Sequence, residues 1–352
     1  MRERFYISHQ TVLLLMMAAV LLTACSSDEP EAQANRAGEV PVDHVVHLAP
    51  LAPGYDVLTS AHRAAPTGYS DYPLNKAIEM GVYVLLPENY ADPVLQRIRY
   101  DGAKWHALFS VEKNKTYTVY GYLPKTGDMS STLTKSTADA ATLTISGMQP
   151  VTTDDICIIT GVKESEEGLK EGSFSWKQDI EGDDYYIYML LNHLYASVNF
   201  SLKVSEGYAQ LRTIKLKTMT LSVNKASVNA AVTLTHNTEG NVPITSVTYT
   251  SSDGSCSAEI LNSAEGEKLR STTPLNIIAC FAPTMSANLT LDSTYDVYDS
   301  KGNLIRANCE ATNKIPNLEA SRGQRVQLNL TVDPTYLYVM SDKDLDNLFT
   351  IE

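Results

Sequence analysis

The chain has 352 residues, of which 43% are hydrophobic and 20% are charged, and its formal net charge is −13. This length is enough for two domains that each bury a core of their own. The acidic balance argues against nucleic acid and against anionic membrane surfaces as partners, because both are themselves negative. Tyrosine outnumbers phenylalanine by 20 to 6, which favours half-exposed strand surfaces over helices.

The chain opens with basic residues, followed by an uninterrupted apolar stretch from Val12 to Leu22. That stretch is much shorter than the ~20 residues of a membrane-spanning helix and ends in small residues, as a cleavable signal peptide does. Leu22-Thr23-Ala24-Cys25 has the form of a bacterial lipobox, which predicts removal of residues 1–24 and acylation of Cys25. An ordinary secretory signal, in which Cys25 has no role, is the alternative. Both interpretations predict an exported protein.

The segment that follows the signal region is extended and ends in a basic site. Ser26–Gly38 is polar and small, which suits a flexible tether. Val42–Leu48 and Asp56–Leu58 read as extended apolar pieces, and Arg63 follows them. Such a strand can be removable, because its excision leaves unpaired N–H and C=O groups beside an apolar groove. The alternative is an ordinary first strand with Arg63 as a surface residue.

Short runs of alternating apolar and polar residues predict β-strands through the rest of the chain. The period of two is clearest in Ala196–Val204 and Val326–Val332. After Thr218 the apolar set moves from even to odd positions, which predicts a β-bulge or a strand switch. Asp101-Gly102 and Lys301-Gly302-Asn303 predict hairpin turns. Further strands are expected at Gly81–Leu86, Thr116–Leu123, Ala141–Ile145, Ile156–Thr160, Tyr185–Leu191, Ala231–His236, Ser246–Thr250, Pro274–Phe281 and Ala287–Leu291.

No long stretch shows a helical period, so many short strands predict an all-β protein built from sandwiches or barrels. The charged, Gly-rich segment Lys163–Gly172, which continues to Asp179–Asp184, divides the chain near its middle. We expect the domain boundary there, with residues 64–178 in an N-terminal β-sandwich and residues 179–352 in a C-terminal one.

No motif for catalysis, a metal or a cofactor is present in the sequence. There is no nucleophile elbow, phosphate-binding loop or dinucleotide fingerprint. His44 and His47 are the only neighbouring histidines, and residues three apart in a strand point to opposite faces. The acidic clusters Asp179–Asp184 and Asp342–Asp346 lack the glycine and glutamate of a calcium loop. We therefore expect a non-enzymatic protein without a metal or cofactor.

The cysteines and aromatic residues allow more than one interpretation. Cys157, Cys256, Cys280 and Cys309 could form disulfides in an exported protein or remain buried free thiols, and none forms a C-x-x-C pair. A carbohydrate-stacking platform could be formed by the aromatic residues Tyr185, Tyr186, Tyr188, Trp105 and Trp176. Aromatic side chains on strands more often pack onto neighbouring strands, which is the interpretation that we favour.

Five features in this order make the chain resemble the fimbrillin family, the type V pilin lipoproteins of Bacteroidales. They are the lipobox, the segment ending in Arg63-Ala64, Leu191–Val198, Tyr295–Arg306 and Val332–Ser341. The resemblance covers nearly the whole chain and depends on the order and spacing of these features. It implies two transthyretin-like Greek-key β-sandwich domains in tandem and export as a lipoprotein to the outer membrane and cell surface.

The resemblance also implies how subunits would assemble. An arginine-specific protease would remove the first strand, and subunits would polymerise by β-strand exchange. Cys25 would carry the lipid that holds the chain at the outer membrane before processing, and residues 25–63 would be the propeptide. Cleavage would fall at Arg63–Ala64, with Arg36–Ala37 as a weaker candidate. The expected donor strand consists of Tyr336, Leu337, Tyr338, Val339 and Met340.

The expected function is therefore that of a structural or adhesive subunit of a type V pilus. Its partners would be other pilin subunits and ligands on host or bacterial surfaces. Two alternatives stay open from the sequence: a pilus anchor that retains its lipid on Cys25, and a carbohydrate-binding surface lipoprotein.

Overall fold

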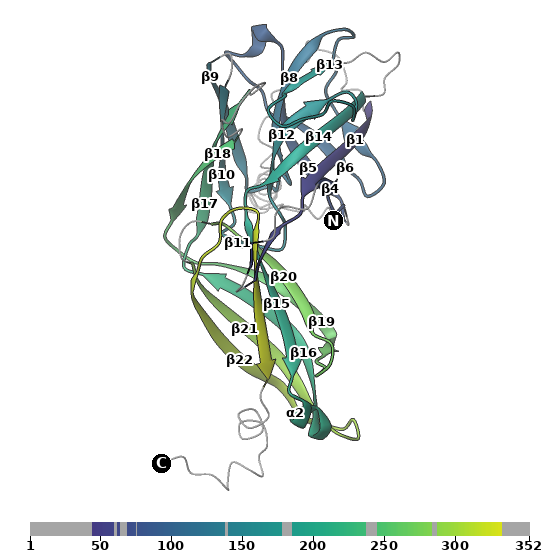
Figure 1. Ribbon diagram of the computed structural model, residues 1–352, viewed down its shortest axis with the longest axis vertical. Coiled ribbons are helices and arrows are strands. Elements are labelled where there is room, and N and C mark those ends of the chain that lie inside the picture. Colours follow the sequence, from purple (N-terminus) through teal and green to yellow (C-terminus); the bar gives the residue numbers. More distant parts are fainter. Residues whose placement is uncertain are drawn as a thin grey trace, which may run out of the picture. The chain divides into compact units, whose positions relative to one another are not determined.

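The computed structural model describes residues 44–59, 62–63, 69–74, 76–137, 140–177, 185–236, 245–283 and 287–332 (Figure 1). The chain divides into residues 1–39 and residues 40–352, and every described residue belongs to the second unit. Cys25, Arg36, Ala64, the donor candidates Tyr336–Met340 and both acidic clusters lie outside the described residues. In the described part of the chain, no helix has the length and apolar character needed to cross a bilayer.

The largest sheet closes on itself. Its strands are β1 (His44–Pro53), β4 (Tyr69–Asp71), β5 (Ile78–Leu85), β6 (Gln96–Tyr100), β7 (Trp105–Ala107), β8 (Thr116–Leu123), β12 (Cys157–Lys163), β13 (Ser175–Lys177) and β14 (Tyr185–His193). They are ordered β12-β14-β1-β7-β6-β5-β8-β13, with β4 beside β1. Because β12 also pairs with β8, the strands from β12 round to β8 form a barrel.

A four-stranded antiparallel sheet packs against the barrel. It has the order β18-β17-β10-β9 and consists of β9 (Ser130–Thr137), β10 (Ala140–Met148), β17 (Ser227–Thr235) and β18 (Thr245–Ser252). One core lies between the two layers, where Tyr83 and Tyr120 of the barrel meet Leu143 and Val232 of the sheet. A second core fills the barrel and includes Met80, Ile98, Trp176 and Met189.

Two further sheets enclose the third core. One has the order β11-β20-β15-β23-β2-β3 and contains β2 (Asp56–Thr59), β3 (His62–Arg63), β11 (Val151–Thr152), β15 (Ala196–Val204), β20 (Leu275–Phe281) and β23 (Gln324–Val332). The other has the order β19-β16-β21-β22 and contains β16 (Arg212–Val223), β19 (Cys256–Lys268), β21 (Ala287–Asp299) and β22 (Leu304–Leu318). Phe200, Phe281, Leu221 and Val297 are buried between these sheets.

The helical elements are short. The 3-10 helix η1 (Pro87–Asn89) follows β5, and α2 (Glu206–Leu211) joins β15 to β16. Ser205 caps α2, since its side chain accepts a hydrogen bond from the Tyr208 backbone N–H.

The all-β expectation is confirmed, and so are the turns and the bulge. β6 and β7 pair across the Asp101-Gly102 turn, and β21 and β22 pair across Lys301-Gly302-Asn303. The register of β16 shifts between Leu216 and Thr218, so that Leu216 and Met219 both enter the core.

The expected pair of transthyretin-like sandwiches is not shown by these sheets, since one of them closes as a barrel. Strands from both sides of the expected boundary after residue 178 also share sheets: β14 lies in the barrel and β17 pairs with β10. The boundary itself stays a prediction.

Candidate functional site

The segment between the tether and Arg63 forms an inner strand of the barrel. β1 pairs in parallel with β14, from Val46 opposite Tyr185 to Leu51 opposite Leu190. On its other side it pairs antiparallel with β7 and, near its end, with β4. Its backbone groups are therefore used on both sides, and its loss would leave unpaired edges on β14 and β7.

The inward side chains of β1 contribute to the barrel core. Val46 and Ala52 are buried there, and Leu48 packs against the same cluster. Burying an aliphatic side chain of this kind stabilises the fold by about 1.5–3 kcal/mol. His44, at the start of the strand, lies with its ring centroid 4.9 Å from that of Tyr185 and its Nε2 3.3 Å from the Ser110 hydroxyl. β1 is thus held by both its backbone and its side chains.

The same segment then supplies a strand to a second sheet. β2 pairs in parallel with β23, with Asp56 opposite Gln324 and Leu58 opposite Val326. β3 turns back antiparallel on β2 and places Arg63 opposite Leu58. A cut after Arg63 would therefore separate β1, β2 and β3 from the rest of the chain.

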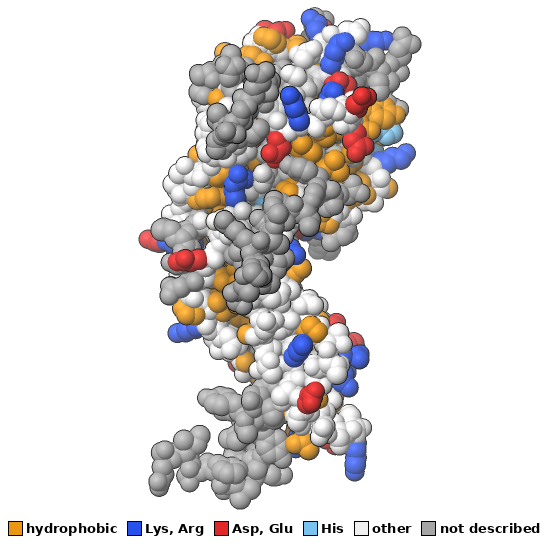
Figure 2. Space-filling view, viewed as in Figure 1, with side chains coloured by type: hydrophobic (Ala, Val, Ile, Leu, Met, Phe, Trp, Pro, Cys, Tyr) orange, Lys and Arg blue, Asp and Glu red, His pale blue; other side chains and the backbone are white. Residues whose placement is uncertain are grey.

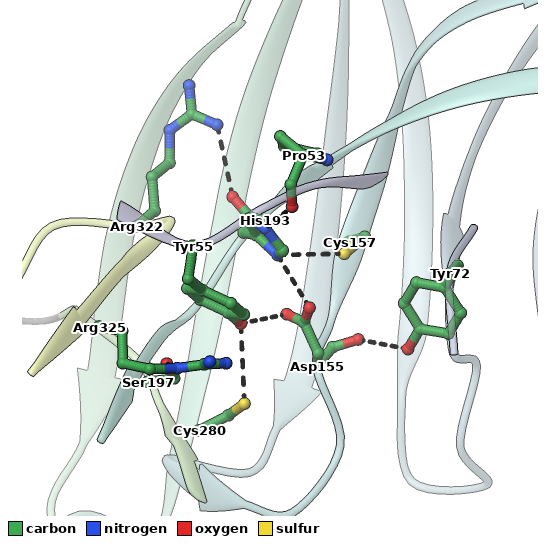
Figure 3. A network of polar contacts seen from close by, with 10 residues as sticks. All are labelled: Pro53, Tyr55, Tyr72, Asp155, Cys157, His193, Ser197, Cys280, Arg322 and Arg325. Carbon is green, nitrogen blue, oxygen red and sulfur yellow. Dashed lines mark hydrogen bonds and ion pairs between the residues drawn. The ribbon is translucent and has the colours of Figure 1, made fainter. Parts of the chain in front are cut away.

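A polar network forms where β1 ends and β2 begins (Figure 3). The hydroxyl of Tyr55, which lies between these strands, donates to Asp155 Oδ1 at 2.6 Å. The other carboxylate oxygen of Asp155 lies 2.8 Å from His193 Nδ1, while Tyr72 donates to the Asp155 backbone carbonyl at 2.7 Å. Asp155 precedes β12 and His193 ends β14. The network therefore joins the leading segment, by which we mean the part of the chain that carries β1, β2 and β3 and ends at Arg63, to barrel strands that follow it in the chain.

His193 connects directly to the backbone of β1. Its Nε2 lies 2.7 Å from the Pro53 carbonyl oxygen, which can only accept a hydrogen bond. Nε2 must therefore carry a proton. The imidazole is buried, with 3% of the residue exposed, and its ring stacks on Tyr55 at a centroid distance of 4.0 Å.

Two thiols lie beside this network. Cys157 Sγ is 3.7 Å from His193 Nδ1, and Cys280 Sγ is 3.7 Å from the Tyr55 hydroxyl. Burial raises the pKa of the Cys157 thiol and raises the pKa of Cys280 to about 12. The pKa of Tyr55 is also raised, first by burial and then by the neighbouring Asp155 carboxylate. The four described cysteines Cys157, Cys256, Cys280 and Cys309 are free thiols.

This arrangement does not support nucleophilic catalysis. A cysteine–histidine–aspartate relay uses the two ring nitrogens for different partners. Here both Cys157 and Asp155 face Nδ1 of His193, and Nε2 is occupied by Pro53. Cys157 is also completely buried, and its raised pKa keeps it in the thiol form.

Arginines near the start of β23 enclose the network from the other side. The Arg325 guanidinium lies 4.6 Å from the centre of the Tyr55 ring, and its Nε donates to the Ser197 hydroxyl at 2.8 Å. Arg322 donates to the backbone carbonyls of His193 and Thr245 at 3.4 and 3.3 Å. The leading segment, the barrel and β23 thus meet at one set of side chains.

Three of the five aromatic residues considered for carbohydrate stacking pack inside the barrel, while Tyr186 and Tyr188 are half-buried. Trp105, Trp176 and Tyr185 are all buried, and the Trp176 indole N–H donates to the Tyr186 carbonyl at 3.0 Å. Tyr186 stacks on His47 at a centroid distance of 4.4 Å. In Figure 2, basic and acidic side chains are interspersed on the visible face, with hydrophobic side chains in small groups among them. The described structure therefore favours the packing interpretation of both tryptophans.

Sequence reasoning singled out Arg63 but not Tyr55, Asp155 or His193. The Tyr55–Asp155 hydrogen bond joins residues 100 positions apart, and His193 and Asp155 are 38 apart. No spacing rule connects such positions. The backbone of Arg63 lies in β3, whereas its role in processing stays a prediction.

No family model matches the sequence. No curated protein matches it. Among solved structures, the chain is similar to a candidate cell adhesion protein of Bacteroides ovatus, with 13% identity, 83% of this chain and 93% of that chain covered, and a TM-score of 0.38. A fimbrial protein of Bacteroides vulgatus has 11% identity, with 83% and 96% covered and a TM-score of 0.29. The fimbrial anchor protein Mfa2 of Porphyromonas gingivalis has 13% identity, with 76% and 82% covered and a TM-score of 0.24.

Proposed function

We propose that this protein is a non-enzymatic structural or adhesive subunit of a type V pilus, assembled by strand exchange after cleavage at Arg63. One observation carries the proposal: the segment before Arg63 supplies β1 to the barrel and β2 to the sheet that contains β23. A single cut thus makes a strand position available in each of two sheets. The chain would reach the cell surface as a lipoprotein acylated on Cys25, with its strands grouped into two transthyretin-like modules.

The vacated positions have the properties that a donor strand requires. Removal of β1 exposes backbone N–H and C=O groups on β14 and β7, together with the apolar interior around Ile187 and Trp105. An extended segment of another subunit can satisfy these groups, and its alternate side chains can enter the barrel core. Tyr336–Met340, beyond the end of β23, is the donor segment that we propose.

The polar network gives the leading segment a defined attachment before the exchange. Tyr55 and the Pro53 carbonyl are held by Asp155 and His193, which remain in the chain after cleavage. These contacts resist departure of the strand in the uncleaved chain. Cleavage favours its departure, because the released segment loses the high effective concentration that tethering gave it.

The proposal is tested by treating the purified full-length chain with an arginine-specific protease. We expect the new N-terminus to be Ala64 by mass spectrometry, and we expect higher oligomers by size-exclusion chromatography. Arg63→Ala should stop both changes, while Arg36→Ala serves as the matched control and should stop neither. A chain that is cut at Arg63 yet stays monomeric, with its leading segment still bound, contradicts the strand-exchange proposal.

A pilus anchor that keeps its leading segment is the second candidate, and the position of β1 favours it. Because β1 pairs on both sides and contributes core residues, its departure opens the barrel. An anchor has no need to release this strand. Mass spectrometry of the mature protein from its native membrane distinguishes the two, since an anchor begins at acylated Cys25 and a cleaved subunit begins at Ala64.

A further inference from the structure

Three metal-ligating side chains of different chemistry converge inside the polar network. Asp155, Cys157 and His193 each offer one ligand atom, and these atoms all lie within 4.8 Å of one another. Cys157 and His193 are buried, and Asp155 is partly buried. The three residues come from β12, the turn before it and the end of β14. A carboxylate, a thiol and an imidazole form a donor set that suits Zn²⁺ and other borderline-soft cations rather than Ca²⁺ or Mg²⁺.

The hydrogen bond from His193 to Pro53 prepares the imidazole for this role. Nε2 must donate to the Pro53 carbonyl, so in the neutral ring Nδ1 carries a lone pair. Nδ1 faces Asp155 Oδ2 at 2.8 Å, a hydrogen-bond distance that in the metal-free chain requires a proton between the two atoms, and it faces Cys157 Sγ at 3.7 Å. Ligating histidines are commonly oriented by a backbone carbonyl on the other ring nitrogen in this way. A cation that binds here displaces the proton between Nδ1 and Asp155 Oδ2 and the thiol proton of Cys157, and the three donor atoms then face it together.

Two of the three distances between the ligand atoms can be compared with those in a tetrahedral zinc site. With the usual bond lengths, a zinc-bound sulfur and imidazole nitrogen lie ~3.6 Å apart and a zinc-bound oxygen and nitrogen ~3.3 Å apart. Cys157 Sγ is 3.7 Å from His193 Nδ1, which is already close to the first value. Asp155 Oδ2 is 2.8 Å from Nδ1, so the carboxylate has to withdraw by about 0.5 Å.

We propose that Asp155, Cys157 and His193 bind a divalent cation of the Zn²⁺ class. On binding, the Cys157 S–H bond breaks, the proton leaves to solvent and a metal–sulfur bond forms, so each bound ion releases at least one proton. The Tyr55 hydroxyl, which donates to Asp155 Oδ1, orients the carboxylate from outside the ligand set. The assignment does not depend on the proposed pilus function.

The test uses the full chain carrying Cys25→Ser, so that no unacylated thiol is present at that position. Metal-free protein is titrated with Zn²⁺ by calorimetry and, separately, with Co²⁺ by absorption spectroscopy. We expect one equivalent of each ion, with the Co²⁺ form showing a thiolate-to-cobalt charge-transfer band and intense tetrahedral bands. Cys157→Ser and His193→Gln should each weaken Zn²⁺ binding by at least about tenfold, and Cys157→Ser should remove the charge-transfer band.

Cys280→Ser and Cys309→Ser are the matched controls, because both thiols lie outside the proposed ligand set. They should retain the band and the affinity. Absence of stoichiometric binding by the parent chain overturns the proposal without any variant. The proposal is also overturned if the thiolate-to-cobalt band survives in Cys157→Ser or disappears in Cys280→Ser. Circular dichroism confirms that each variant is folded.

Discussion

The ring of Tyr55 stacks on the ring of His193, with centroids 4.0 Å apart and planes inclined by 22°. Tyr55 precedes Arg63 in the chain, and His193 lies at the end of a barrel strand that follows it. The contact therefore joins the segment expected to leave on cleavage to a part that remains. Asp155 reinforces it by binding both residues, so these three side chains connect the stability of the fold to release of the leading segment.

Loss of the Asp155 carboxylate should destabilise the protein. Asp155→Ala leaves the buried Tyr55 hydroxyl and His193 Nδ1 without their hydrogen-bond partner. We expect the free energy of unfolding to fall by about 2–3 kcal/mol, measured by denaturant unfolding.

Asp253→Ala is the control for this variant. Asp253 pairs with Lys225 at 2.9 Å, but its side chain is 96% exposed. An exposed pair of this kind contributes little, so the variant should unfold close to wild type. Equal effects of the two variants would contradict the structural role assigned to Asp155.

Thiol reactivity should report departure of the leading segment. In the intact chain Cys157 and Cys280 are buried, whereas Cys256 and Cys309 are partly exposed. Alkylation should label Cys256 and Cys309 before Cys157 and Cys280, as measured by peptide mass spectrometry. After cleavage and release of Tyr55, which lies beside Cys280, labelling of Cys280 should accelerate. Unchanged protection of Cys280 in a chain that has lost the segment would show that Tyr55 does not cover it.

The raised pKa of Cys280 adds a pH dependence to this experiment. Its thiol ionises near pH 12 in the folded chain but at about 8.5 in an unfolded one. The protonated Cys280 thiol therefore makes its full contribution to stability at pH values below its pKa in the unfolded chain. This contribution is lost as the pH rises through its pKa in the folded chain. Labelling in the intact chain should increase with pH well above 8.5, and Cys280→Ser should reduce the loss of stability over this range.

Trp176→Ala tests the choice between core packing and carbohydrate binding. The side chain is completely buried in the barrel, with its indole N–H bonded to Tyr186. We expect a loss of about 3–5 kcal/mol in unfolding free energy, measured by denaturant unfolding. Glycan-array binding lost by a variant that keeps wild-type stability would instead support a carbohydrate site.

Local patterns in the sequence predicted much of the fold. The alternation in Ala196–Val204 matches β15, and Thr116–Leu123 matches β8 residue for residue. The parity change after Thr218 located the bulge in β16. These features depend on a few adjacent residues, for which the strand period and the turn chemistry are sufficient.

Features that depend on distant partners could not be predicted in this way. β17 pairs with β10 although Val232 and Leu143 are far apart in the chain, and the contact of β8 with β12 that closes the barrel leaves no local signal. In the sequence, Asp155 lies in a charged stretch before a strand and His193 lies at the end of another strand, and neither position indicates that the two side chains meet. Their meeting with Tyr55 follows from β1 lying beside β14, a parallel pairing that no turn specifies.

Weakening the hold of β1 should accelerate strand exchange. Val46→Ala removes two methyl groups from the barrel core, which should cost about 1.6 kcal/mol, while the backbone pairing with β14 and β7 remains. The cleaved variant should release its leading segment and form oligomers faster than the cleaved wild type, as followed by chromatography at fixed times. Val45→Ala makes the same truncation at the neighbouring position, whose side chain lies outside the barrel core cluster, so it is the matched control and should change the rate little. Equal rates for Val46→Ala and wild type would mean that departure of β1 does not limit assembly.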